Sequence, residues 1–200
     1  MKASSQHRSR LIAAALTASL ATTLPAMADQ AADQAIDQQL QEYRQAMQTF
    51  GKTLKGELQA AMQEGGALAA VNICHERAPE IASDLSEATG FTLRRTSLKP
   101  RATTPTDWER AVLEDFESRH AAGEAPGTIE WHEVAEVDGE HRLRFMKAIE
   151  TQEVCLTCHG QKIDPALKAK INQLYPEDQA TGFQKGDIRG AFSIIAAIDD

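Results

Sequence analysis

Two cysteines and a histidine stand close together in the C-terminal half of the chain, at Cys155, Cys158 and His159. The spacing Cys-x-x-Cys-His is the attachment signature of a c-type haem. In that chemistry each thiol adds to one vinyl group of the same porphyrin, and the following histidine can coordinate the iron from one face. The motif therefore predicts one covalent haem c per chain, with His159 as an axial ligand.

Three other uses of the Cys-x-x-Cys pair compete with haem attachment. A dithiol redox pair usually begins a helix in a βαβ unit, and no such unit is visible in this sequence. A structural zinc site would recruit Cys74 and a histidine, but the chain lacks a second close ligand pair at zinc-site spacing. A structural disulfide is the third alternative, although this geometry is more often reactive than structural. We favour haem attachment.

The first 28 residues have the organisation of a secretory signal peptide. Three basic residues precede an apolar run rich in alanine, and Ala26-Met27-Ala28 matches an A-x-A cleavage site. A retained membrane anchor is the alternative, but the run is short for a membrane span. We expect cleavage after Ala28, a periplasmic location, and a single c-type haem-binding domain over residues 29–200.

The acidic balance of the chain restricts its partners. The full chain has 21 Lys+Arg and 29 Asp+Glu, and the predicted signal peptide holds three of the basic residues and no acidic one. Removing the peptide therefore changes the net charge from −8 to −11. Such a protein is repelled by nucleic acid and by anionic lipid, and a basic redox or signalling partner would suit it. After the signal peptide we expect no membrane span.

The pattern of apolar residues predicts an α+β domain, with an antiparallel sheet flanked by helices and a long N-terminal helix. Apolar residues at alternating steps of three and four predict that helix over 30–64, with Gly65-Gly66 ending it. Its apolar stripe packs on the rest of the domain or forms the seam of a homodimer. Two strands at 129–137 and 141–149 are predicted to form a hairpin around Asp138-Gly139.

Shorter elements complete the expected order. They are a helix from Ala67 to about Ser86 with Pro79 inside or at a break, a strand at 91–97, a helix capped by Thr106-Asp107, a helix from Asp164-Pro165 through Tyr175, and a closing strand at 191–198.

Cys74 has no partner once Cys155 and Cys158 are thioethers. A lone thiol in an oxidising compartment is a liability unless it is buried or ligated. Cys74 is therefore a candidate for the second axial position, where a thiolate would lower the redox potential. It is equally well explained as a small buried hydrophobe on a helix face. Rival ligands are His75, His120, His132, His141, Met47, Met62 and Met146.

Several blocks of the sequence resemble one protein family and follow the same order. They are Val71–Ala82, Leu93–Ser97, Leu143–Ile149, the haem motif and Gly186–Ser193. This is the family of small c-type haem domains with a PAS-like fold, found as free periplasmic proteins and as sensor regions of bacterial histidine kinases. The resemblance implies a PAS-like fold and makes Cys74, in its Cys-x-x-x-x-Pro block, the distal haem ligand opposite His159.

Four basic residues, Arg94, Arg95, Lys99 and Arg101, cluster in this otherwise acidic chain. Charge-assisted hydrogen bonds to haem propionates are one interpretation, with Arg95 and Arg101 as the candidates. The alternative is an exposed strand edge protected against aggregation by positive charge.

Two functions from different classes remain open. The first is electron transfer, or redox or gas sensing, by a monohaem protein with His159 and Cys74 as axial ligands and no catalytic residues. The second is a haem enzyme with an open distal site, of a peroxidase-like or nitrogen-oxide-reacting kind. An enzyme would need a distal acid–base group, and no motif positions one.

Overall fold

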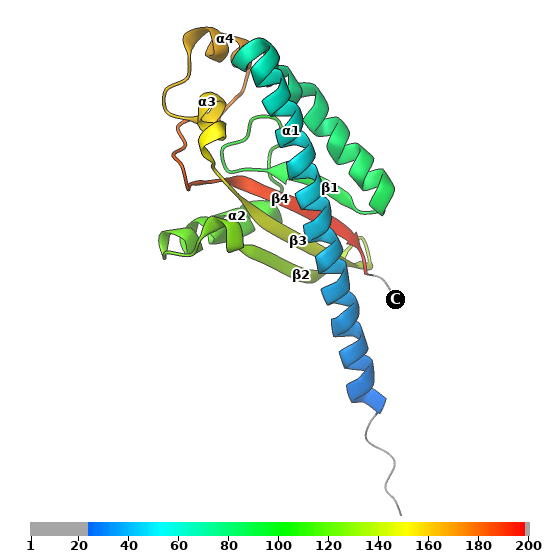
Figure 1. The fold of residues 1–200 in the computed structure, drawn as a ribbon. Coiled ribbons are helices and arrows are strands. Elements are labelled where there is room, and N and C mark those ends of the chain that lie inside the picture. Colours follow the sequence, from blue (N-terminus) through cyan, green and yellow to red (C-terminus); the bar gives the residue numbers. More distant parts are fainter. Residues whose placement is uncertain (1–23, 199–200) are drawn as a thin grey trace, which may run out of the picture.

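The computed structural model describes residues 24–198, with side chains from residue 30 on. It is the predicted α+β fold, with a long N-terminal helix beside an antiparallel sheet (Figure 1). The elements, in chain order, are α1 (Leu24–Thr89), β1 (Thr92–Thr96), α2 (Asp107–Ala121), η1 (Pro126–Thr128), β2 (Glu130–Val137), β3 (Glu140–Glu150), η2 (Glu153–Cys155), α3 (Leu156–His159), α4 (Pro165–Leu174) and β4 (Ile188–Ala197). The predicted signal peptide falls mostly outside the described residues.

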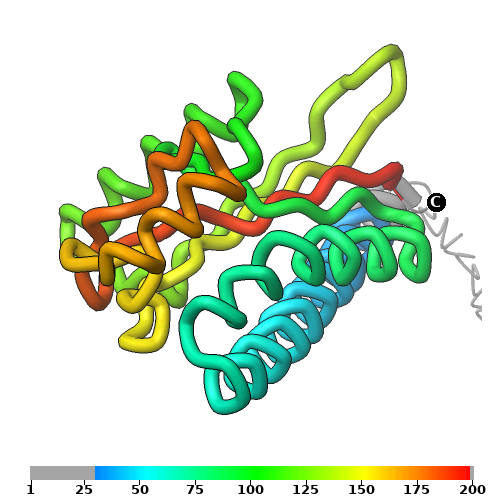
Figure 2. Tube along the Cα trace, turned by 90° about the horizontal axis from the view of Figure 1, so that it is seen from above, coloured from blue at the N-terminus to red at the C-terminus, as the bar shows by residue number. Residues whose placement is uncertain are grey.

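Helix α1 folds back on itself at Gly66. The backbone of Gly66 has φ 68° and ψ −165°, a conformation that glycine adopts without steric cost. The two arms of α1 lie side by side (Figure 2), and Arg77 on the second arm forms an ion pair with Glu57 on the first at 2.8 Å. The predicted helix end is thus confirmed, and the second arm continues through Pro79.

The sheet has four antiparallel strands in the order β1-β4-β3-β2. Strands β2 and β3 form the predicted hairpin. Asp138 and Gly139 at its turn have φ values of 55° and 81°, as a two-residue turn of the type I′ class requires. Strand β4 closes the sheet by pairing with β3 on one side and with β1 on the other.

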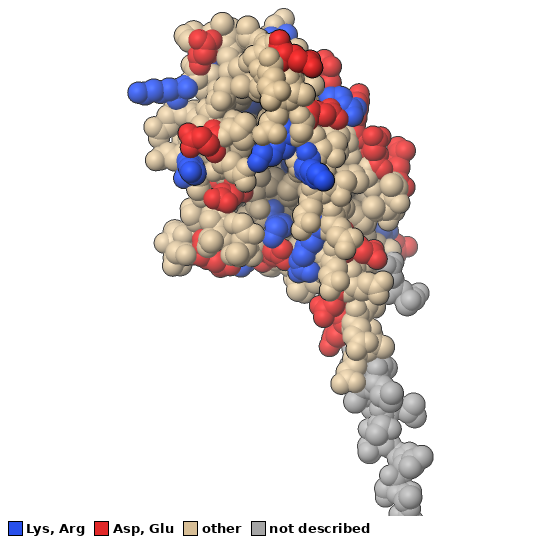
Figure 3. All heavy atoms as spheres, in the orientation of Figure 1, with Lys and Arg blue, Asp and Glu red and all other residues tan. Residues whose placement is uncertain are grey.

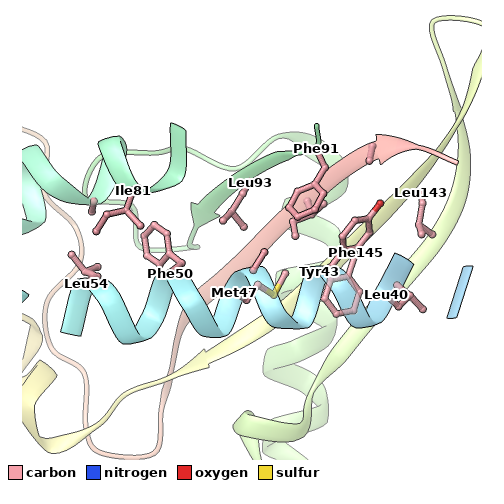
Figure 4. Packing of buried hydrophobic residues seen from close by; sticks show 14 residues of the cluster. Leu40, Tyr43, Met47, Phe50, Leu54, Ile81, Phe91, Leu93, Leu143 and Phe145 are labelled. Carbon is pink, nitrogen blue, oxygen red and sulfur yellow. The ribbon is translucent and has the colours of Figure 1, made fainter. Parts of the chain in front are cut away.

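One face of the sheet is covered by α1. The apolar stripe of the first arm packs here, with Tyr43, Phe50 and Phe145 buried in a single cluster (Figure 4). The rings of Tyr43 and Phe91 meet edge to face with centroids 4.8 Å apart. This part of the stripe therefore packs on its own domain, and Met47 is a core residue.

Helix α2 covers the opposite face of the sheet. Because side chains alternate along a strand, Phe145 faces α1 whereas its neighbour Met146 packs with Val112 and Phe116 of α2. The first turn of α2 is fixed by Glu109, whose carboxylate accepts a hydrogen bond of 2.8 Å from the Thr106 N–H, as expected for the predicted cap. Met146, like Met47, is thus a core residue.

None of the helices within residues 24–198 combines the length and the apolar character needed to cross a membrane.

Candidate functional site

The Cys-x-x-Cys-His motif forms one compact turn after strand β3. Cys155 is the last residue of η2, and Cys158 and His159 end the short helix α3. Both cysteines are half-buried and neither forms a disulfide. The turn that carries the motif lies at one end of the sheet, beside α1 (Figure 1).

His159 is held in one orientation by its Nδ1 atom, which lies 2.8 Å from the carbonyl oxygen of Ala180. A carbonyl only accepts, so Nδ1 carries the proton and Nε2 has the free lone pair. Burial lowers the pKa of His159 well below its ordinary value, and the charges of Arg189 and Arg101 lower it further. The imidazole is therefore neutral at pH 7, the form that binds metals.

Arg101 positions the motif from the loop after β1. Its Nη2 donates to the Cys158 carbonyl at 2.9 Å, and its Nη1 lies 3.4 Å from His159 Nε2. Arg101 is itself paired with Asp178, with 2.8 Å between Nε and Oδ1 and only 1% of the Asp178 side chain exposed. Arg101, a candidate for propionate binding from the sequence, is thus already engaged by a carboxylate.

Cys74 lies on the second arm of α1, on the side that packs against the motif. Val71, one turn before it, belongs to the same apolar cluster as Cys158, together with Ile171 and Tyr175 around α4. Cys74 itself is half-buried. Residues more than 80 positions apart in the chain are therefore brought together at one site.

Electrostatic effects place Cys74 within range of the motif. Burial raises the pKa of Cys158, and the neighbouring Cys74 raises it further. Burial also raises the pKa of Tyr175 to about 12, again with a contribution from Cys74. A charge on Cys74 is thus felt by residues on both sides of the site.

Among the rival ligands, His75 lies next to the site, because Tyr175 belongs to the apolar cluster around Cys158, whereas the other histidines lie on α2 and on the hairpin. His75 is exposed and its ring meets Tyr175 edge to face at 5.1 Å. His132 and His141 lie on the β2–β3 hairpin. His120, near the end of α2, lines a pocket of about 370 Å³ that contains none of the three cysteines. Met62 is half-buried on the first arm of α1.

Arg189, at the start of β4, was not singled out from the sequence. Ile188, the residue before it, pairs with Glu150 at the end of β3, a few residues before the motif. Burial lowers the pKa of Arg189, while Cys155 and Cys74 raise it. Its Nε atom is buried and has no hydrogen-bond partner. A second half-buried arginine, Arg95, lies on the neighbouring strand β1, and burial followed by the charge of Arg189 lowers the pKa of Arg95 to about 10. A single arginine within a predicted strand gives no sequence signal that it lies beside a binding site.

The residues around the motif fit a flat, largely apolar group with acidic substituents. The cluster around Val71, Ile171 and Tyr175 supplies apolar contacts, and the cysteines supply thiols for attachment. His159 offers a neutral nitrogen, and the orphaned Nε of Arg189 calls for an acceptor. Among the described residues no group of three or more His, Cys, Asp and Glu is arranged to hold a metal ion.

The fold and site together define a class: a small α+β domain with a helical hairpin on one face of its sheet and a cysteine–histidine site at the sheet's end. Residues 22–197 match the Tll0287-like family, and the chain belongs to this family.

A solved structure supports the same fold. The chain is similar to the crystal structure of the cyanobacterial haem protein Tll0287, with a TM-score of 0.61 and 21% sequence identity. The similarity covers 82% of this chain and 96% of that chain. No curated protein matches the chain.

Proposed function

We propose that this protein binds one haem c covalently through Cys155 and Cys158, with His159 and Cys74 as its axial ligands. The observation that carries the proposal is the packing of the Cys74 segment of α1 against the Cys-x-x-Cys-His turn. The family membership, and the description of the similar cyanobacterial structure as a haem protein, support it.

The chain's own residues would each have a distinct task at this site. Cys155 and Cys158 tether the group, and His159 presents Nε2 because Ala180 holds Nδ1. When the group binds, Arg101 would give up its 3.4 Å contact with His159 Nε2. It would keep its ion pair with Asp178 and its hydrogen bond to the Cys158 carbonyl. Val71 and Ile171 exclude water. Haem in such a site supplies a one-electron couple whose potential the axial ligands set.

We further propose that the protein transfers electrons, or senses redox state or a gas, in the periplasm after cleavage following Ala28. Two protein ligands leave no open coordination position, which favours electron exchange over chemistry on a substrate. Gas sensing would require that reduction, or protonation of the Cys74 thiolate, first frees one position. Its acidic surface favours a basic partner protein. As a sensor with a PAS-like fold, the protein would act on a separate kinase. We also propose that two copies form a homodimer through the exposed part of α1.

The decisive experiment is expression of the full chain in a bacterial host that attaches c-type haem. We expect a denatured-protein spectrum typical of covalent haem, lost in the double variant Cys155→Ser/Cys158→Ser. Electron paramagnetic resonance of the native ferric protein should show a low-spin centre with thiolate character.

Two results would contradict parts of this proposal. Absence of covalent haem from the wild-type protein would exclude a c-type haem protein. A zinc site or a thiol function of the Cys-x-x-Cys pair would then be favoured. Covalent haem with a high-spin, five-coordinate ferric spectrum would exclude Cys74 as a ligand. That second result would favour the haem enzyme with an open distal face.

A further inference from the structure

Two arginines on neighbouring strands converge beside Cys74. Arg95 of β1 lies on the α1 face of the sheet, with its guanidinium carbon 4.9 Å from the centre of the Phe50 ring. Arg189 of β4 is within electrostatic range of Arg95, Cys74, Cys155 and His159. The strand pairing agrees with this, because β1 and β4 are neighbours and Ile188 pairs with Glu150 at the end of β3 from which the motif follows.

A β-bulge directs Arg189 to this face. In strand β4, Ala191 packs with α2, and strict alternation would place Arg189 on the α2 face as well. The pairing with β3 instead passes from Gly190, opposite Ile149, to Ile188, opposite Glu150, and skips Arg189. Arg189 is thus the extra residue of a bulge, a device that redirects a side chain and is common beside functional sites.

Gly190 makes the bulge possible. Its φ is 150°, and a Cβ atom at this position would lie 2.2 Å from the carbonyl oxygen of Thr96 on β1. Ser97 also donates a hydrogen bond of 2.7 Å to the Arg189 carbonyl. The backbone around Arg189 is therefore fixed by β1, the strand that carries Arg95.

Neither arginine has a carboxylate partner. Within residues 30–198, Arg101 and Arg94 form ion pairs with Asp178 and Glu109, whereas no ion pair involves Arg95 or Arg189. Both side chains are half-buried, and the Nε atom of Arg189 is fully buried without an acceptor. Two neighbouring cations that are partly removed from water and lack a counter-ion are costly. The arrangement is stabilised when acidic oxygens occupy the space between them.

We propose that Arg95 and Arg189 bind the propionate carboxylates of the haem. The inference rests on the proposed function. It names the residues that bind the acidic edge of the haem. It replaces Arg101 by Arg189 in the pair expected from the sequence, because Asp178 already neutralises Arg101. Each guanidinium can donate two parallel N–H bonds to a carboxylate, which fixes orientation as well as charge.

The test uses the haem-loaded full chain and its variants Arg95→Gln and Arg189→Gln, with Arg142→Gln at the exposed end of β3 as the control of equal charge change. Resonance Raman spectra report hydrogen bonding to the propionates through their bending modes. We expect both site variants to shift these modes and the control to leave them unchanged. Loss of one nearby positive charge should also lower the equilibrium constant for reduction about tenfold, equivalent to 59 mV for one electron.

Two further variants separate this inference from simpler explanations. Arg189→Lys keeps the positive charge but loses the pair of parallel N–H donors of the guanidinium. We expect this variant to bind haem even if Arg189→Gln does not, and to shift the propionate modes. In a Cys74→Ser background the shift caused by Arg189→Gln should persist. Its disappearance there would mean that the arginines serve the thiolate, which overturns the proposal.

Unchanged propionate modes in Arg95→Gln and Arg189→Lys would also overturn it. So would wild-type modes at the frequency of propionates free in water. A wild-type protein without covalent haem would instead contradict the proposed function itself, so the two failures are distinguishable.

Discussion

The tautomer and charge of the His159 imidazole are set by its immediate surroundings. The Ala180 carbonyl fixes the tautomer, burial keeps the ring neutral, and Arg101 lies against the nitrogen that would bind a metal. A partner on the far ring nitrogen is the usual way in which proteins orient a metal-binding histidine. The residues around His159 thus suit coordination of a metal by Nε2, and Cys74 is the ligand that we propose for the opposite side.

Replacing Cys74 tests that opposite face. We expect Cys74→Ser to retain covalent haem, to lose thiolate character in its ferric spectrum, and to favour the reduced state by about tenfold or more, since an anionic donor has been removed. Redox titration followed by absorbance gives this value. His75→Ala removes the rival ligand on the same helix, whose ring contacts Tyr175, and should retain the thiolate character of the wild-type spectrum. If His75→Ala alone changed the spectrum, the ligand assignment would be wrong.

Asp178 provides a prediction about pH. Burial raises its pKa, but hydrogen bonds and charge from Arg101, with help from the Ala180 N–H and Lys168, lower it below the ordinary 3.8. A carboxylate with a depressed native pKa stabilises the fold above its unfolded pKa, and this stability disappears as pH falls through the native pKa. Asp178→Asn should therefore reduce stability at neutral pH and flatten the loss of stability in acid. Urea titrations from pH 3 to 7 measure both effects; an unchanged acid limb would contradict the assignment.

At the scale of elements, backbone turns decide which side chains meet. The reversal of α1 at Gly66 returns the second arm to the sheet and brings Cys74 to the motif. The bulge before Gly190 rotates Arg189 toward the same place. Both devices depend on glycine, because each backbone conformation lies at positive φ.

The Gly66 reversal predicts opposite outcomes for two glycines in one helix. Gly66→Ala places a side chain at φ 68° and should cost about 1 kcal/mol of unfolding free energy. Gly56→Ala lies within the regular first arm with nothing within 4 Å of the new Cβ atom. It should stabilise by about 0.5–1 kcal/mol. Thermal unfolding compares them, and equal effects would contradict a left-handed backbone at Gly66.

Gly190 should be the least replaceable glycine of the sheet. Gly190→Ala forces β1 and β4 apart because its Cβ would overlap the Thr96 carbonyl, so we expect a loss of more than about 1 kcal/mol. Gly127→Ala, whose nearest neighbour is a Glu150 side-chain oxygen at 3.8 Å, serves as the control. Wild-type stability of Gly190→Ala would show that the bulge is not constrained by β1.

For the whole molecule, the two cores and the charged surface have separate tasks. The α1-side and α2-side clusters hold the sheet between the helices, whereas acidic side chains form scattered patches on the face shown in Figure 3. Basic side chains gather near the middle of that view. With a net charge of −8 for the full chain, long-range attraction favours a positively charged partner and weakens with salt.

The α1-side cluster contains the largest buried aromatic side chains that pack between α1 and the sheet. Phe145 is fully buried between Tyr43 and the sheet, so Phe145→Ala should cost about 3–5 kcal/mol. Val134 on the edge strand β2 is 47% exposed, and Val134→Ala should change stability by no more than about 0.5 kcal/mol. Chemical denaturation measures both values. Similar costs for the two variants would contradict the α1-side core.

Local sequence signals determined the longer helices and strands and the attachment motif, although β4 begins at Ile188 and not at the predicted residue 191. Asp138-Gly139 specified a tight turn, Gly65-Gly66 ended a helix, and Cys155 to His159 indicated the cofactor, because each acts through bonds and contacts between near neighbours in the chain. Only the tertiary structure decided which arginine is free: Asp178 occupies Arg101, while a strand bulge exposes Arg189 to the site. Ion pairs and bulges depend on contacts between segments that are distant in the sequence. The pattern of residues within one segment does not predict these contacts.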